Sequence, residues 1–328
     1  MTGPCGSVRR VRVLPLLALG AALLGAAGCG RSTLDAVSDE PAQPGPLHPV
    51  HPEPVPPDPS PVRPAIVRFA VIGDYGVDSE FEARVARMVS GWNPDFVITT
   101  GDNNYPAGSA STIDANIGKY YAPFIGGYRG AYGPGSATNR FWPSPGNHDW
   151  DGDSLAPYLD YFTLPGNGRY YDVVIGPVHL FALDSDDREP DGNTEASAQG
   201  RWLEAALSSS SSCFDVAYFH HPAYSSGPHG SNLWMRWPFE AWGTEIVFAG
   251  HDHIYERVKV GGIRHITVGV SGNETYPFAA PVAGSEARFS GERGALLATA
   301  RDDGISFQFF ADDGREIDSY TLDRPCPQ

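Results

Sequence analysis

Short apolar runs that close on polar residues recur along the chain from residue 65 onward. The clearest are residues 65–75, 95–103, 178–186, 214–222 and 244–253, which are rich in β-branched and aromatic residues. Runs of this length and composition predict buried β-strands. Because each run ends in residues such as Gly, Asp, Asn and His, polar side chains are expected just beyond the end of each strand.

Two other segments place apolar residues on one face of a helix. They are residues 80–92 and 196–207, in which the apolar positions recur at helical spacing. Strands that alternate with helices in this way predict an α/β domain whose strands are joined by crossover connections.

A third pattern is antiparallel. Two β runs meet at Gly176-Pro177, and the C-terminal segment carries Asp-Gly turns at Asp303-Gly304 and Asp313-Gly314. Such turns between β runs predict hairpins. Crossovers together with hairpins favour a two-sheet mixed β-sandwich flanked by helices over a single doubly wound sheet, and the chain shows no internal repeat.

The first 64 residues differ from the rest in composition. Arginines precede an apolar run at residues 13–28, which is too short for a comfortable membrane span. The segment "LLGAAGC" resembles a bacterial lipobox, so residues 1–28 are predicted to be a lipoprotein signal peptide and Cys29 the lipidated residue, with an ordinary signal peptide as the alternative. Residues 29–64 are so rich in proline that they predict a disordered stalk.

This leader implies an exported protein, held to a membrane by its N-terminal lipid and facing the periplasm or the cell exterior. Residues 65–328 then form the predicted catalytic domain. An oxidising compartment permits a disulfide between Cys213 and Cys326. Two buried thiols are the alternative.

Charge excludes one class of partner. Asp and Glu number 39 against 23 Lys and Arg, which gives a formal net charge of -16. An acidic chain repels the phosphate backbone, so binding to nucleic acid is not expected. Hydrophobic residues make up 41% of the chain and aromatic residues 12%, proportions typical of a packed globular protein.

The polar clusters that follow the strands share one type of side chain, namely potential metal ligands. Each offers oxygen or imidazole ligands suited to hard or borderline metal ions. Clusters at the carboxyl ends of neighbouring strands are expected to meet at one edge of an α/β fold. They are "GDYG" with Asp74, "GDNNY" with Asp102, "GNHD" with Asn147 and His148, "FHHP" with His220 and His221, and "GHDH" with His251 and His253.

These motifs, in this order, resemble the calcineurin-like metallophosphoesterases, and most closely the purple acid phosphatase branch. The "YER" at residues 255–257 also matches that branch. Most metallophosphoesterases carry a histidine where this chain has Gly76, and the resemblance implies that Tyr105 replaces it. A phenolate is a hard anionic donor that favours a trivalent ion, so the implied cofactor is a dinuclear centre of Fe(III) and a divalent ion (Fe, Zn or Mn).

The resemblance also implies which residue binds which ion. His220 is preferred to its neighbour His221 because the family's ligand precedes a proline by two positions. The ferric site would comprise Asp74, Asp102, Tyr105 and His253, and the divalent site Asp102, Asn147, His220 and His251, with Asp102 bridging the two.

Two further histidines are candidate catalytic residues. His148 follows the ligand Asn147, and His229 lies nine residues after His220, as the substrate-facing histidine does in mammalian and plant relatives. Either could protonate the leaving group of a phosphoester.

The expected function is that of an acid phosphatase, which hydrolyses monoesters of phosphorylated small molecules by attack of a metal-bridging hydroxide. A phosphodiesterase or nucleotide hydrolase on the same scaffold is one alternative. A non-catalytic lipoprotein that binds phosphate or metal is another.

Overall fold

The structure is a computed structural model that describes residues 66–152 and 154–326. The predicted signal peptide, Cys29 and the proline-rich stalk lie outside the described residues. Among the helices of the described part, none is long and apolar enough to cross a membrane.

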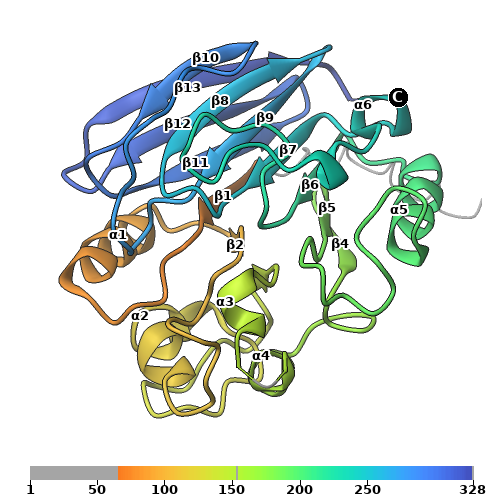
Figure 1. Cartoon of the computed structure of the whole chain (residues 1–328). Helices are drawn as coiled ribbons and strands as arrows, with labels where there is room; N and C mark the ends of the chain where they lie inside the picture. Colours follow the sequence, from red (N-terminus) through yellow and green to blue (C-terminus); the bar gives the residue numbers. More distant parts are fainter. Residues whose placement is uncertain (1–65, 153, 327–328) are drawn as a thin grey trace, which may run out of the picture. The chain divides into compact units, whose positions relative to one another are not determined.

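Two mixed β-sheets stack on one another (Figure 1). The first has the order β13-β12-β11-β1-β2-β3, in which β1, β2 and β3 run parallel and the other neighbours antiparallel. Its strands are β1 (Val67–Ile72), β2 (Phe96–Thr99), β3 (Phe141–Pro143), β11 (Gly294–Arg301), β12 (Gly304–Ala311) and β13 (Glu316–Asp323).

The second sheet has the order β10-β8-β9-β7-β6-β5-β4. Strands β5, β6, β7 and β9 run parallel, and the remaining pairs are antiparallel. The strands are β4 (Tyr171–Ile175), β5 (Val178–Ala182), β6 (Phe214–Tyr218), β7 (Ile246–Ala249), β8 (Tyr255–Val260), β9 (Ile263–Val268) and β10 (Ser285–Phe289).

The main core lies between the sheets, and each sheet also has a covered outer face. In β1, Phe69 and Val71 belong to the core between the sheets, whereas Ala70 and Ile72 pack beneath the helices on the other side. Successive residues of a strand point to opposite faces, so a strand buried on both faces becomes apolar throughout. This explains the unbroken apolar runs of the sequence.

Helices flank both sheets. Helix α1 (Glu80–Gly91) covers the first sheet and begins at Ser79, whose hydroxyl accepts a hydrogen bond from the Glu82 amide at 3.1 Å. Helix α5 (Ala198–Ser208) covers the second sheet (Figure 1). The shorter helices are α2 (Lys119–Tyr121), α3 (Asn147–Trp150), α4 (Ala156–Tyr161) and α6 (Phe239–Trp242), with single turns at Asp114–Gly118, Ala122–Phe124 and Leu233–Met235.

The prediction of an α/β, two-sheet mixed β-sandwich flanked by helices is confirmed. The two predicted helices are present, and the hairpin at Gly176 joins β4 to β5. The turn predicted at Asp303-Gly304 lies one residue earlier, because Gly304 already pairs with Arg301 as the first residue of β12.

The C-terminal segment is tied to the second sheet. Cys326 follows β13 and its sulfur lies 1.98 Å from that of Cys213, which precedes β6. The Cys326 amide also donates a hydrogen bond to the Asp302 carbonyl at 2.7 Å. The disulfide, not this hydrogen bond, connects the end of edge strand β13 of the first sheet with the start of the interior strand β6 of the second.

We expect Cys326→Ser to lower the free energy of unfolding, since the cysteines are separated by 113 residues and a loop of this length contributes on the order of 4–5 kcal/mol in the chain-entropy model. Denaturant titration under oxidising conditions measures the loss. Cys213→Ser should give the same loss, and the double variant no more than either. Additive losses, or a wild-type midpoint insensitive to reductant, would contradict the bridge.

Candidate metal centre

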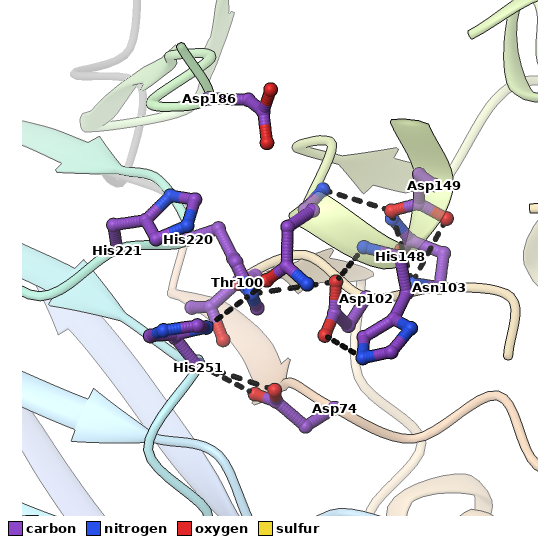
Figure 2. A network of polar contacts seen from close by, with 12 residues as sticks. Asp74, Thr100, Asp102, Asn103, His148, Asp149, Asp186, His220, His221 and His251 are labelled. Carbon is purple, nitrogen blue, oxygen red and sulfur yellow. Dashed lines mark hydrogen bonds and ion pairs between the residues drawn. The ribbon is translucent and has the colours of Figure 1, made fainter. Parts of the chain in front are cut away.

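The polar clusters meet where the parallel strands of both sheets end. Asp74 follows β1, Asp102 follows β2 and Asn147 follows β3 in the first sheet. His220 follows β6 and His251 follows β7 in the second. Figure 2 shows Asp74, Asp102, His220 and His251 converging from these different elements.

The backbone at this meeting point is strained. Three residues here have φ angles in the left-handed region: Asp74 (53°), Asp102 (51°) and His251 (68°). For a residue other than glycine this conformation costs roughly 1–2 kcal/mol. Crowding explains the adjoining glycine of "GHDH", since a Cβ at Gly250 would lie 2.5 Å from the Asp74 carboxylate. This backbone conformation turns side chains from separate loops toward one another.

One group of donor atoms surrounds the Tyr105 hydroxyl. This oxygen lies 2.9 Å from Asp102 Oδ2, 3.3 Å from Asp74 Oδ1 and 3.2 Å from His253 Nε2. His253 Nε2 is in turn 3.4 Å from Asp74 Oδ1. All four residues are buried. They are the set predicted for the ferric site.

A second group surrounds His220 Nε2. It lies 2.9 Å from Asn147 Oδ1, 3.3 Å from Asp102 Oδ1 and 3.2 Å from His251 Nδ1. These are the residues predicted for the divalent site. The two carboxylate oxygens of Asp102 therefore belong to different groups, Oδ2 to the first and Oδ1 to the second.

Hydrogen bonds at Nδ1 fix the orientation of the His220 and His253 rings. His220 Nδ1 lies 2.9 Å from the Thr100 carbonyl, and His253 Nδ1 lies 2.7 Å from the Glu274 carbonyl. A carbonyl oxygen accepts a hydrogen bond, so each Nδ1 carries a hydrogen, and each Nε2 presents a lone pair when the ring is neutral. In neutral His220 that lone pair would face the oxygens of Asn147 and Asp102, so the arrangement is satisfied either by a second proton on the ring or by a metal cation in its place. The donor set therefore fits a pair of metal ions.

The charges of the centre point the same way. Burial, followed by the carboxylates of Asp102 and Asp74, raises the pKa of Tyr105 well above its usual value. Burial opposes charge on His220, yet Asp102 raises the pKa of this imidazole to about 10. A bound cation reverses both tendencies, because it favours the phenolate and the neutral imidazole as ligands.

The predicted catalytic histidines lie at the rim. The His148 amide donates to Asp102 Oδ1 at 2.8 Å, and its ring lies 4.4 Å from the Tyr105 ring. His229 is exposed, and its ring centre is 4.4 Å from that of His251. Both rings are thus adjacent to the donor groups without belonging to either.

His221 occupies a neighbouring position, as predicted. It is buried, and its Nδ1 lies 2.9 Å from the Ser185 hydroxyl. It is also close enough to His220 and His251 for the three imidazoles to hold one ion. The Nε2 of His220 nevertheless contacts both Asn147 and Asp102, which places His220 at the centre of the donor group.

Sequence reasoning missed several residues that support the site. Asp149 accepts hydrogen bonds from the amides of Asn103 and Gly146, at 3.1 Å and 2.8 Å. Asp252, between the two predicted histidine ligands, accepts a hydrogen bond from the His229 amide at 2.9 Å. Both aspartates are buried and lie inside the metal-ligand motifs, Asp149 in "GNHD" and Asp252 in "GHDH". Their position beside the predicted ligands is the signal that could have revealed them.

Comparison with known proteins agrees with the motifs. The model of the calcineurin-like phosphoesterase family matches residues 67–255. Purple acid phosphatase 17 of Arabidopsis thaliana is 26% identical over 221 residues, which cover 58% of this chain and 63% of that protein. The chain spans less than two thirds of this relative and about half the length of others that it matches.

Solved structures share the architecture. A purple acid phosphatase from yellow lupin seeds (Lupinus luteus) superposes with a TM-score of 0.63 at 19% identity, over 81% of this chain and 55% of that one. The anchor in the inner membrane complex of Plasmodium superposes with a TM-score of 0.62 at 17% identity, over 80% of this chain and 90% of that one. Identities this low show a common fold only.

Proposed function

The chain belongs to the calcineurin-like phosphoesterase family, and on that premise we propose that it is an acid phosphatase that hydrolyses phosphate monoesters at a dinuclear metal centre. The observation that carries the proposal is the division of the Asp102 carboxylate, whose two oxygens face separate groups of donors. A carboxylate shared in this way suits two adjacent ions.

The donors of the first group favour Fe(III). Tyr105 offers a phenolate and Asp74 a carboxylate, both hard anionic ligands. The second group, with an amide oxygen and two imidazoles, suits a divalent ion such as Fe, Zn or Mn. When bound, the metal pair would polarise the phosphoryl group and lower the pKa of an attacking water molecule.

The rim histidines would handle the leaving group. An alkoxide leaves more readily when a proton is delivered to it, and an imidazole is suited to this task at mildly acidic pH. His229 stands over His251 and is exposed, so a substrate in contact with the centre can reach it. His148, whose amide is fixed on Asp102, would contact the phosphoryl group from the opposite rim.

Hydrolysis of nitrophenyl phosphate tests the proposal directly. We expect the purified, metal-loaded protein to cleave the monoester at least about tenfold faster than the matching bis-nitrophenyl diester. The reason is that a monoester presents up to two negative charges and a single organic group to the metal pair and the rim histidines, whereas a diester presents one negative charge and two organic groups. The reverse preference would indicate a phosphodiesterase. No hydrolysis of either ester by protein containing two metal ions would favour a binding role.

The ferric assignment predicts a colour. A phenolate bound to Fe(III) absorbs visible light through charge transfer from ligand to metal, so the oxidised protein should be pink to purple. Tyr105→Phe keeps the ring and removes the donor oxygen, and should abolish the absorption band and weaken iron retention. Absorption spectra and metal analysis check both. A colourless wild-type protein that is fully active with two zinc or two manganese ions would overturn the assignment of iron.

We also propose that the protein is exported and held to a membrane through a lipid on Cys29, on the evidence of the apolar run and the lipobox-like "AAGC" that precede the proline-rich segment. Cys29→Ser should then move the protein from the membrane fraction to the soluble fraction without loss of hydrolytic activity. Mass spectrometry of the N-terminal peptide checks the lipid. Membrane retention of the variant would contradict the anchor.

A further inference from the structure

We propose that Glu256, the glutamate of the "YER" motif, is a positioning residue that ties together the two loops bearing His229 and Tyr276. The loops are residues 225–229, which follow β6, and residues 273–282, which connect β9 to β10. The inference deepens the proposed function and rests on it, because it assigns a cause for the placement of His229 beside the metal centre.

Glu256 lies in β8 with its carboxylate on the outer face of the second sheet. Its neighbour Tyr255 belongs to the core between the sheets, and side chains alternate along a strand, so Glu256 points away from that core. It is fully buried. Within residues 66–152 and 154–326, no basic side chain forms an ion pair with it.

Three hydrogen bonds satisfy this carboxylate. Ser226 donates two of them, from its amide to Oε2 at 2.7 Å and from its hydroxyl to Oε1 at 2.6 Å. Ser285, the first residue of β10, donates the third to Oε1 at 2.6 Å. A buried carboxylate without a cationic partner depends on such donors, because losing them leaves a charge that neither water nor protein solvates.

Ser226 in turn holds the second loop. Its carbonyl accepts a hydrogen bond from the Ala279 amide at 2.8 Å. Its hydroxyl, which donates to Glu256, also accepts from the Val282 amide at 2.9 Å. One serine therefore connects the buried carboxylate with both loops, so that displacement of either loop breaks hydrogen bonds of the other.

The two loops place aromatic rings over the metal centre. The Tyr276 ring stacks on His253 with a centroid distance of 4.1 Å and an interplanar angle of 10°. The His229 ring lies 4.4 Å from His251 and 5.5 Å from Tyr276. His229 and Tyr276 thus form two adjoining walls beside the two predicted histidine ligands of "GHDH".

Asp252 supplies a second hold on the first loop, since it accepts hydrogen bonds from the Ser225 hydroxyl and the His229 amide. It does not reach the loop of Tyr276 through any hydrogen bond of the described residues. Through Ser226, Glu256 therefore helps to set the position of the His229 loop relative to the Tyr276 loop, which is also held by the Tyr276 amide on the His253 carbonyl at 2.9 Å. This relative position determines where the leaving group of a substrate meets His229.

Glu256→Gln tests the inference, because glutamine keeps the shape but has only one oxygen left to accept the hydrogen bonds that the two carboxylate oxygens share. We expect faster hydrogen exchange in both loops of the metal-loaded protein, unchanged exchange in β7 and unchanged metal content. Hydrolysis of a monoester with a poor leaving group should fall by at least about tenfold, and that of nitrophenyl phosphate by less.

A double-mutant cycle with His229→Ala separates positioning from general damage. If Glu256 acts through His229, Glu256→Gln should change the hydrolysis rate little in the His229→Ala background. Ser226→Ala, which removes one hydroxyl and keeps the amide contact, should reproduce the exchange pattern to a smaller degree and serves if Glu256→Gln does not fold. Lys259→Gln, an exposed substitution in the same strand β8, is the matched control and should leave loop exchange unchanged.

Unchanged exchange in both loops of Glu256→Gln and Ser226→Ala would overturn the inference, as would fully additive losses in the cycle. A wild-type protein that hydrolyses no phosphoester would instead overturn the proposed function. The exchange measurement would then still decide whether Glu256 ties the two loops together.

Discussion

The structure depends on the crowding of electron-pair donors around Asp102. Carboxylate, phenol, amide and imidazole atoms from both sheets approach to 2.9–3.3 Å of one another, and only the protons on Tyr105 and His220, or metal ions in their place, hold these electron-rich atoms together. Unfavourable contacts of this kind persist only where the surrounding fold holds them in place. The left-handed backbone at Asp74 and Asp102 is part of the same constraint, because it turns both side chains inward from strands that run in parallel.

The sequence reveals these donors because each one follows a strand that is buried on both faces. Apolar runs locate β1, β2, β5, β6 and β7. Parallel pairing within each sheet aligns their carboxyl ends, and the packing of the two sheets brings the two sets of ends together. The spacing within "GHDH" then separates its histidines, since His251 faces one donor group and His253 the other. The residues predicted as ligands lie close together for this geometric reason, and the assignment of each to one ion stays a prediction.

Other parts of the structure were not predicted. Residues 113–124 form one continuous helical stretch of mixed type, and its buried residues Ile113, Ile117, Tyr121 and Phe124 recur at helical spacing, so a periodic signal was present there. Helices α3 and α4 and strand β3 are too short for an apolar pattern to repeat. The bonds from Ser226 to Glu256 and Val282 join residues 30 and 56 positions apart. Nothing in the sequence indicates that a serine in a glycine-rich loop forms a hydrogen bond with a glutamate in a strand. Only the three-dimensional arrangement therefore assigns a role to the glutamate of "YER".

Charge connects the centre with the rest of the molecule. The chain carries a formal net charge of -16, which includes Asp74 and Asp102, and a deprotonated Tyr105 would bring the negative charges at this one buried point to three. Without metal, burial and the two carboxylates keep Tyr105 protonated, and the site repels a phosphate dianion. A trivalent and a divalent ion bring five positive charges, which exceed those three and leave the centre attractive to an anion. On the proposed function, metal loading would therefore control both the protonation of the ligands and the entry of substrate, and an acidic protein could bind phosphate because the positive charge would be confined to this point.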